Sequence, residues 1–361
     1  LVSTTFYESP PKMYAGTEGQ VWFLAEELNK LGHKVSVVAP VGSRFSKGIE
    51  HIPTVVPQLG NMQEDAVWPN ILLPRLVDLK TGEAKGEFDV VHERSFTMWS
   101  YMAAKDHPDV KVCATVDWQM HWHLLPQVQS GEVSALPPVP HANLIGISNA
   151  HSLAVSAALG VPVEYVYNGL PVETFPFQKE KGDRFLYLGR IARFKGPHLA
   201  IHLADKLGVP LDVCGEDRFV GDPSYVHQVM NACRRMAVYR GEVRLERKLE
   251  LLKNAKAVLF PAIWPEPFGL VPIEANACGT PVVALDYPGS AITEVIEDGV
   301  NPRPEPLGAM HDSSMLWRLA PDPGIARLDQ RPVPARGPRK PSLTHSANQP
   351  STVSAASTRS A

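Results

Sequence analysis

The stretch FLYLGRIARFKGPHLAIHLADKLGVPLDVC, residues 185–214, decides the fold. It begins with the apolar run Phe185–Gly189, which is typical of a buried strand. The run Pro197–Leu207 has the proline start and the apolar spacing of a helix, and Leu211–Cys214 is again strand-like. A strand, a helix and a second strand in this order form the repeating unit of a parallel sheet covered by helices. We therefore predict an α/β domain around this stretch.

The same alternation continues on both sides of that stretch. Toward the C-terminus we expect, in turn, the helix Glu246–Ala255, the strand Ala257–Phe260, the helix Leu270–Ala277, the strand Pro281–Leu285 and the helix Ser290–Ile296. Toward the N-terminus the strand candidates are Leu1–Thr5, Val35–Ala39, Phe88–His92, Val110–Val116, Asn143–Ser148 and Glu164–Tyr167. Between the first two of these, apolar residues from Val21 to Leu31 share one helical face, and Gly32 ends that helix. The pattern predicts two doubly wound units in tandem.

The boundary between the units is marked by Pro171–Lys181, a stretch with proline, charge and little periodicity. We predict Rossmann-like domains over residues 1–170 and 171–300. The remaining residues, 301–361, hold ten of the 34 prolines of the chain, many arginines and a Ser/Thr/Ala-rich end. Such a segment cannot bury enough apolar surface to offset its ordering entropy, so we expect this tail to be largely disordered or irregular.

The bulk composition is that of a globular protein with two domains. The chain has 361 residues, of which 44% are hydrophobic and 20% are charged. Its formal net charge of −3 excludes a general attraction to nucleic acid or anionic lipid. No apolar run approaches the roughly 20 residues that span a bilayer. The chain opens on the strand-like LVSTT without a charged leader, so we expect a cytoplasmic protein.

The cysteines do not form a pattern that holds a metal. There are four, and none belongs to a C-x-x-C pair: Cys113, Cys214, Cys233 and Cys278. We interpret them as small buried apolar residues, and we expect neither a disulfide nor a zinc site.

A basic loop follows the first strand of the second unit. Gly189 and Arg190 end the strand, and Lys195 stands just before the next helix. A helix N-terminus attracts anions, and a forked guanidinium and a lysine beside it suit a diphosphate. Taken alone, the same pattern also fits two solvated surface cations beside a tight turn.

The stretch PEPFGLVPIE, residues 265–274, favours the anion site. Its two prolines, Pro267 and Pro272, confine the helix to the residues after Gly269, which places Glu266 in a loop and Glu274 on a helix. Open α/β sheets bind ligands at the carboxyl ends of their strands, and carboxylates there accept from sugar and ribose hydroxyl groups. Each glutamate alone would be interpreted as a cap or an exposed residue, whereas the combination indicates a binding site.

These motifs resemble a known family. FLYLGRIARFKG and EPFGLVPIEANACGTPVVA resemble the donor half of the retaining glycosyltransferases of family 4, which have the GT-B fold and an E-x7-E signature. YVYNGLPVETF resembles their interdomain segment, and VSTTFYESPPKMYAGTEGQVWFLAEEL resembles their N-terminal strand and glycine loop. The resemblance covers about residues 1–301. It implies two Rossmann-like domains facing a central cleft, the first binding the acceptor and the second binding the donor.

The resemblance also implies an activity and its residues. A sugar would pass from a nucleotide diphosphate to an acceptor hydroxyl with retained anomeric configuration, and no metal or other cofactor would be required. Arg190 and Lys195 would stabilise the departing diphosphate, Glu266 would contact the donor sugar and Glu274 the ribose. The full set of implied donor-binding residues is Gly16, Thr17, Gly189, Arg190, Lys195, Gly215, Glu266, Phe268, Gly269, Leu270 and Glu274.

The acceptor side departs from the family pattern. Relatives carry a functional histidine where this chain has Asp117, a carboxylate that accepts hydrogen bonds but cannot donate one when ionised. We count Asp117 among the catalytic candidates. Trp118 and His121, with His123 beside them, are weak candidates for an acceptor site, as is His92 at a strand end. The alternative interpretation of His121 and His123 is that they are rim residues of a loop.

Several functions remain open at this point. The leading hypothesis is a glycosyltransferase that uses a UDP-sugar, with GDP or dTDP as alternatives, and a small-molecule or oligosaccharide acceptor. The rivals are an epimerase or phosphorylase of the same fold and a non-catalytic sugar-nucleotide-binding protein. Residues 41–90 contain no basic amphipathic helix, which favours a soluble acceptor over a membrane-bound one. More loosely, the chain resembles the glycosyltransferases of avilamycin-type antibiotic biosynthesis.

Overall fold

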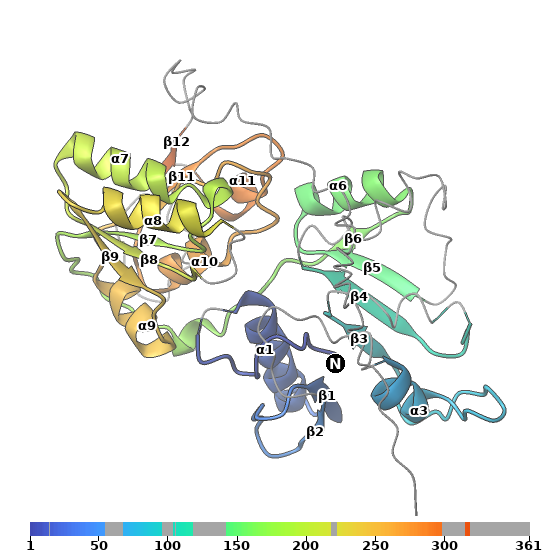
Figure 1. Cartoon of the computed structure of the whole chain (residues 1–361). Helices are drawn as coiled ribbons and strands as arrows, with labels where there is room; N and C mark the ends of the chain where they lie inside the picture. Colours follow the sequence, from blue (N-terminus) through green and yellow to red (C-terminus); the bar gives the residue numbers. More distant parts are fainter. Residues whose placement is uncertain are drawn as a thin grey trace, which may run out of the picture. The chain divides into compact units, whose positions relative to one another are not determined.

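The computed structural model describes most of the chain up to residue 297. The described residues are 1–13, 15–54, 68–95, 104, 106–117, 142–217, 222–297 and 315–317. Two groups of parallel strands with helices beside them organise this part of the chain (Figure 1). Residues 1–318 form one compact unit by their contacts.

The second group is a six-stranded parallel sheet in the order β12-β11-β10-β7-β8-β9. Its strands are β7 (Phe185–Leu188), β8 (Leu211–Cys214), β9 (Ala237–Gly241), β10 (Val258–Phe260), β11 (Val282–Leu285) and β12 (Met315–Trp317). The chain starts in the middle of the sheet at β7, builds one side and then returns to build the other. Reversal of the strand order between β7 and β10 is the doubly wound arrangement that the sequence predicts.

Helices cover both faces of this sheet because its strands alternate their side chains. In β7, Leu186 and Leu188 join one buried cluster and Tyr187 joins another. The Tyr187 cluster includes residues of α7 (Pro197–Leu207) and α8 (Pro223–Ala232), and the Leu186 cluster includes residues of α9 (Leu245–Asn254), α10 (Leu270–Ala277) and α11 (Ile292–Val295) (Figure 1). Burial on both faces is what the near-continuous apolar strands of the sequence indicate.

The first group of strands is also parallel. β3 (Val91–Glu93), β4 (Val112–Val116), β5 (Ala142–Gly146) and β6 (Glu164–Tyr165) pair in that order, and β1 (Val35–Ala39) pairs with β2 (Ile49–Pro53). Val2 joins the two pieces, because it bridges Val38 of β1 and Glu93 of β3. The predicted N-terminal strand is therefore present as a bridge in the middle of the sheet.

The helices of the first group pack against these strands. α1 (Gly16–Lys30) buries Val21 and Ala25 against β1, and α6 (Asn149–Leu159) buries Val155 and Leu159 in the core under β4 and β5. Ser148 caps α6 by accepting from the backbone N–H of His151. Short helical segments complete the list: η1 (Trp68–Leu72), α3 (Leu73–Leu76), η2 (Val172–Thr174) and η3 (Arg193–Lys195).

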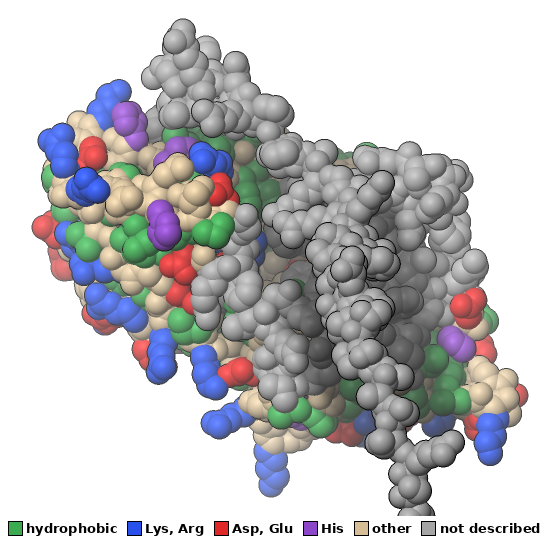
Figure 2. Space-filling view, viewed as in Figure 1, with side chains coloured by type: hydrophobic (Ala, Val, Ile, Leu, Met, Phe, Trp, Pro, Cys, Tyr) green, Lys and Arg blue, Asp and Glu red, His purple; other side chains and the backbone are tan. Residues whose placement is uncertain are grey.

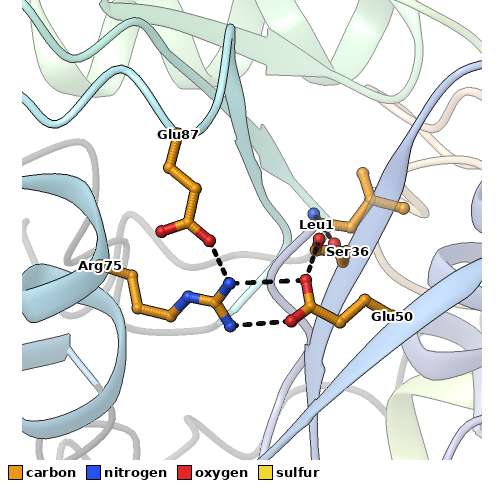
Figure 3. A network of polar contacts seen from close by, with 5 residues as sticks. All are labelled: Leu1, Ser36, Glu50, Arg75 and Glu87. Atoms are coloured by element: carbon orange, nitrogen blue, oxygen red, sulfur yellow. Dashed lines mark hydrogen bonds and ion pairs between the residues drawn. The ribbon is translucent and has the colours of Figure 1, made fainter.

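Polar contacts tie β1, β2 and α3 together at the surface of the first group (Figure 3). Arg75 donates from Nη1 to Oε1 of Glu50 at 3.0 Å and also pairs with Glu87, while Ser36 donates to Glu50 at 2.5 Å. The hydrogen bond from Ser36, followed by those from Arg75, lowers the pKa of Glu50. These side chains are substantially exposed, so the network orients neighbouring elements and contributes little stability.

The tail differs from the expectation at one place. Met315–Trp317 forms β12, a parallel strand beside β11, within a segment for which we expected largely irregular structure. Its apolar residues supply an edge strand although the flanking sequence lacks any apolar period. The rest of the tail lies outside the described residues. The domain boundary near residue 170 remains a prediction.

Candidate functional site

Three loops of the second sheet leave it at the same edge. The loop after β7 carries Gly189 and Arg190, the loop after β8 carries Gly215 and Glu216, and the loop after β10 carries Glu266. These strands are neighbours and parallel, so their carboxyl ends meet. The predicted residues Gly189, Arg190, Gly215 and Glu266 are thus brought to one edge of the sheet.

Glycines allow these loops to approach closely. A Cβ atom at Gly215 would overlap the carbonyl oxygen of Gly189, and one at Gly196 would overlap the carbonyl oxygen of Pro261. Gly196 also has φ +71°, in the left-handed region that favours glycine. The chain therefore turns from η3 into α7 directly against the loop that carries Glu266.

The first carboxylate of the pair, Glu266, is almost buried, at 8% exposure. Its Oε2 accepts from Nζ of Lys195 at 2.5 Å and from Nε1 of Trp264 at 2.7 Å. Nothing in the described part of the chain donates to its Oε1. One oxygen is thus held by the protein and the other is available to a ligand hydroxyl group.

Lys195 is held by both charge and aromatic rings. Its ammonium lies 4.3 Å from the centre of the Trp264 ring and 5.8 Å from that of Phe194. Burial lowers the pKa of Lys195, although the attraction of Glu266 opposes the change. A cation desolvated in this way interacts strongly with any phosphate that reaches it.

The second carboxylate, Glu274, lies on α10 at 7% exposure. Its Oε1 accepts from Nζ of Lys248 at 2.6 Å, while Oε2 is buried and receives no hydrogen bond from any described residue. A buried acceptor without a donor costs about 1–3 kcal/mol, so this oxygen indicates a place for a ligand hydroxyl or a water molecule. Glu266 and Glu274 are each held by a lysine through one oxygen only.

Lys248 was not among the predicted site residues. It lies on α9, four positions before the buried Leu252 and three after Leu245. A lysine among the apolar positions of a helix indicates that its ammonium pairs with a buried carboxylate. Its partner comes from another helix, which the local pattern does not reveal.

Arg190 completes the basic part of the site. Its Nε lies 3.6 Å from Oε2 of Glu216, a carboxylate that is 5% exposed, while the arginine side chain is 32% exposed. Three cations and three carboxylates therefore meet as pairs: Arg190 with Glu216, Lys195 with Glu266, and Lys248 with Glu274. An incoming diphosphate would compete for cations that are already oriented, and their predicted role in holding it stays a prediction.

The remaining donor candidates lie around these pairs. Gly269 precedes α10 with φ +96°, Leu270 begins that helix, and Phe268 is 4% exposed. Gly16 begins α1, where a Cβ atom would lie 3.0 Å from Cδ1 of Leu270, and Thr17 follows it in the first turn. The start of α1 therefore lies against the start of α10.

Glu18 lies in the glycine loop that the family resemblance covers, but the sequence assigned it no role. It lies in the first turn of α1, 4% exposed, and accepts from Oγ1 of Thr4. Burial is the largest cause that raises its pKa from 4.5 to about 7. An acidic residue in the first turn of a helix is usually explained by its favourable interaction with the helix dipole. The sequence therefore gave no reason to expect a buried carboxyl group.

The acceptor candidates are only partly described. Both carboxylate oxygens of Asp117 accept from Arg94, which also donates to Oδ1 of Asn168 at 2.8 Å. Asp117 and Arg94 are 6% and 7% exposed. Asp117 is thus engaged by an arginine that we did not predict, and its catalytic role stays a prediction. Trp118 and His121 lie outside the described residues.

His92 is neutral near pH 7 in this structure. It lies on β3, and its Nε2 is 2.7 Å from Oγ1 of Thr115. Burial, with a smaller contribution from the charge of Arg94, lowers the pKa of His92 to about 4. Its predicted contact with a ligand would therefore be that of a neutral imidazole.

The described residues form neither a metal cluster nor a membrane span. No group of three or more His, Cys, Asp or Glu side chains among them is arranged to hold a metal ion. All four cysteines are described, and no disulfide joins any of them. No described helix is both long and apolar enough to cross a membrane. On the face shown in Figure 2, positive and negative side chains are interspersed over the described surface.

Two family models match the chain in succession. Residues 14–174 match the model described as Glycosyltransferase Family 4, and residues 173–303 match the model described as Glycosyl transferases group 1. The first match contains the glycine loop, and the second contains the three ion pairs described above.

Curated relatives are similar over different lengths. A glycogen synthase of Mycobacterium tuberculosis is 32% identical over 139 residues, which is 35% of this chain and only 32% of that protein. The phosphatidyl-myo-inositol mannosyltransferase of Mycolicibacterium smegmatis is 28% identical over 311 residues, 79% of this chain and 75% of that protein. The D-inositol 3-phosphate glycosyltransferase of Frankia alni is 25% identical over 330 residues, 78% of each chain.

Solved structures share the fold. AviGT4, a glycosyltransferase involved in avilamycin A biosynthesis, is 25% identical with a TM-score of 0.54, covering 81% of this chain and 78% of its own. Anabaena HepE, solved with UDP and glucose, is 16% identical with a TM-score of 0.58, covering 85% of this chain and 84% of its own. The second likeness concerns the fold alone.

Proposed function

We propose that the chain is a glycosyltransferase of the GT-B fold, which transfers a sugar from a nucleotide diphosphate to an acceptor hydroxyl with retention of anomeric configuration. One observation carries this proposal. Glu266 and Glu274 each give one oxygen to a lysine and keep the other for a ligand, at the strand edge that also holds Arg190. Two open carboxylate oxygens beside cations suit a ligand with both hydroxyl and phosphate groups.

Each of these residues binds a different part of the donor. Oε2 of Glu274 accepts from a ribose hydroxyl group, and Oε1 of Glu266 accepts from a hydroxyl group of the donor sugar. Arg190 and Lys195 stabilise the charge that develops on the diphosphate as it departs, which is the role that a metal ion plays in other transferases. The leaving phosphate takes the proton of the acceptor hydroxyl, so the chain needs no nucleophile and no cofactor.

The donor that we propose first is a UDP-sugar, with GDP- and dTDP-sugars as alternatives. The support is Anabaena HepE, a protein of the same fold whose crystal structure contains UDP and glucose. For the acceptor we propose a small molecule or an oligosaccharide. AviGT4 supports a role in antibiotic biosynthesis, and the glycogen synthases support polysaccharide synthesis.

A panel of sugar nucleotides tests the proposal. The protein is incubated with UDP-glucose, GDP-mannose or dTDP-glucose, and the release of nucleoside diphosphate is followed with and without mono- and oligosaccharide acceptors. We expect slow hydrolysis of one donor, faster release with a suitable acceptor, and no change when EDTA is added. Proton NMR of the product should show the anomeric configuration of the donor.

A second candidate function has its own observation. The Asp117–Arg94 pair is almost buried on the side where relatives are expected to carry a histidine, which favours a protein that binds a sugar nucleotide without transferring the sugar. Tight binding of a donor without turnover, with every acceptor in the panel, would support this candidate and contradict the transferase.

A further inference from the structure

We propose that Trp264 is a positioning residue for Glu266, and that its indole N–H keeps Oε1 of that carboxylate free for the donor sugar. This inference rests on the proposed function. Trp264 lies in the loop between β10 and α10, two positions before Glu266, and is 7% exposed.

The geometry separates the two oxygens of Glu266. The indole Nε1 of Trp264 and the ammonium of Lys195 both donate to Oε2, at 2.7 Å and 2.5 Å. A lysine ammonium is a compact charge on a flexible chain, and alone it can approach either oxygen of a carboxylate. An indole N–H is directional and fixed by its ring. Trp264 therefore decides which oxygen is occupied.

The same ring holds the lysine. The Lys195 ammonium lies 4.3 Å from the Trp264 ring centre, and the ring packs against Phe194 with centroids 4.9 Å apart. The backbone joins the two loops as well, because the N–H of Ile263 donates to the carbonyl of Phe194 at 2.8 Å. Trp264 is thus a common support for the anion-facing lysine and the sugar-facing glutamate.

The backbone around Trp264 is restricted before any ligand arrives. Trp264 and Glu266 each precede a proline, and a residue before proline is confined largely to extended conformations. The carbonyl of Glu266 also accepts from the N–H of Ala291 at 2.8 Å. A group held in this way loses little freedom when the sugar binds, which strengthens its effect on the reacting donor.

Packing alone would explain a buried tryptophan in this cluster. The two explanations differ in what the N–H group does, because phenylalanine preserves an aromatic ring but cannot donate. We therefore choose Trp264→Phe, with Trp22→Phe as the matched control. Trp22 also donates its indole N–H, to the carbonyl of Arg44 at 3.2 Å, and lies on α1.

The first test uses the sugar nucleotide that the wild type hydrolyses fastest. It measures kcat for hydrolysis of that donor and the affinity for the corresponding nucleoside diphosphate. Trp264→Phe should lower kcat for donor hydrolysis about tenfold, because a hydrogen bond to a charged group is lost, and should leave the affinity for the nucleoside diphosphate within about twofold. Trp22→Phe should change neither. Equal losses of nucleotide affinity and turnover in Trp264→Phe would indicate a general packing defect and overturn the inference.

A double-mutant cycle with Glu266→Ala gives an independent test. If Trp264 acts through Glu266, adding Trp264→Phe to Glu266→Ala should reduce donor turnover by less than about twofold. Thermal unfolding of all variants checks that they are folded. If the two substitutions reduce turnover independently, so that their fold-losses multiply in the double mutant, the inference is contradicted. The assignment as a transferase would still stand. A wild type that turns over no donor would instead remove the proposed function and this inference with it.

Discussion

At the scale of single residues, the site consists of carboxylates that are half occupied. One carboxylate oxygen of Glu266 and one of Glu274 accept from a lysine, and both residues are less than a tenth exposed. The ion pairs fix the orientation of the carboxylates and limit the cost of burying their charge. The remaining oxygens are the part of each group that a ligand can use, so substitutions there should weaken ligand binding.

Replacement of Glu274 tests that statement. Glu274→Ala should weaken binding of the nucleoside diphosphate at least tenfold, because a charge-assisted hydrogen bond to ribose is lost. Calorimetric titration measures the affinity. Glu250→Ala, a change of an exposed glutamate on α9, is the control and should leave the affinity unaltered. An unchanged affinity in Glu274→Ala would remove Glu274 from the ribose site.

Replacement of the lysine partner should act on stability. Lys248→Met leaves the buried carboxylate of Glu274 without its counter-charge and should lower the free energy of unfolding by about 3 kcal/mol. Lys253→Met removes a lysine from a more exposed pair with Glu250 on the same helix, and it should cost less than about 1 kcal/mol. Urea denaturation compares the two variants, and equal losses would show that the Lys248 pair is not effectively buried.

At the scale of elements, the turns that bring loops together restrict which residues the sequence can have there. The turn from η3 into α7 depends on Gly196, whose missing side chain lets the chain pass against the carbonyl of Pro261. The turn after α7 also ends on a glycine with positive φ, Gly208, but a Cβ atom there would meet nothing within 4 Å. The two glycines share a backbone conformation and differ in their surroundings.

This difference gives a matched pair of substitutions. Gly208→Ala should cost about 1 kcal/mol, since only the left-handed backbone is strained. Gly196→Ala adds an overlap with a backbone carbonyl and should cost about 3 kcal/mol or more. Thermal unfolding of both variants measures the difference. Similar midpoints would mean that the loop before α7 is not packed against Pro261.

The start of α1 predicts a pH dependence. The folded-state pKa of Glu18 is about 7, above its ordinary 4.5, so the native state binds this proton more tightly than the unfolded state. The resulting stability is fully present below pH 4.5 and is lost as the pH rises toward 7, and it amounts to about 3 kcal/mol at most. Glu18→Gln should therefore gain stability relative to the wild type at pH 8 but not at pH 4.5. A constant difference between these pH values would contradict the buried carboxyl group.

The sequence predicted the elements of the donor unit closely. Helices α7 and α10 and strand β8 occupy the predicted residues, because proline starts, glycine turns and apolar spacing agree there. The prediction missed β2, α8 and β9. β2 and β9 lie at sheet edges with exposed residues, so they lack a continuous apolar run. α8 had a readable start, with Asp222 as its cap and Pro223 behind it, which we did not use.

The sequence identified Arg190 and Lys195 in one stretch and Glu266 and Glu274 in another, but it did not show which residues pair. Glu266 and Glu274 are close in sequence, and their spacing was sufficient to find them. Their partners come from other elements: Lys248 from α9, and Lys195 from the loop before α7. Spacing shows which residues share a loop or a helix face, whereas pairing between elements depends on how the helices pack on the sheet.

At the scale of the whole molecule, the described residues contain two groups of parallel strands, and the second group brings three of its loops to one edge. The second group holds the pairs Arg190–Glu216, Lys195–Glu266 and Lys248–Glu274. The first unit contributes Gly16 at the start of α1 and the Asp117–Arg94 pair after β4 and β3. A Cβ atom at Gly16 would lie 3.0 Å from Cδ1 of Leu270, the first residue of α10.

A crystal structure of the chain with uridine diphosphate is the measurement that decides whether this edge is the donor site. We predict that a ribose hydroxyl group donates to Oε2 of Glu274 and that the diphosphate lies against Arg190 and Lys195. If the nucleotide binds elsewhere and Oε2 of Glu274 has no ribose partner, the assignment of the donor site is contradicted.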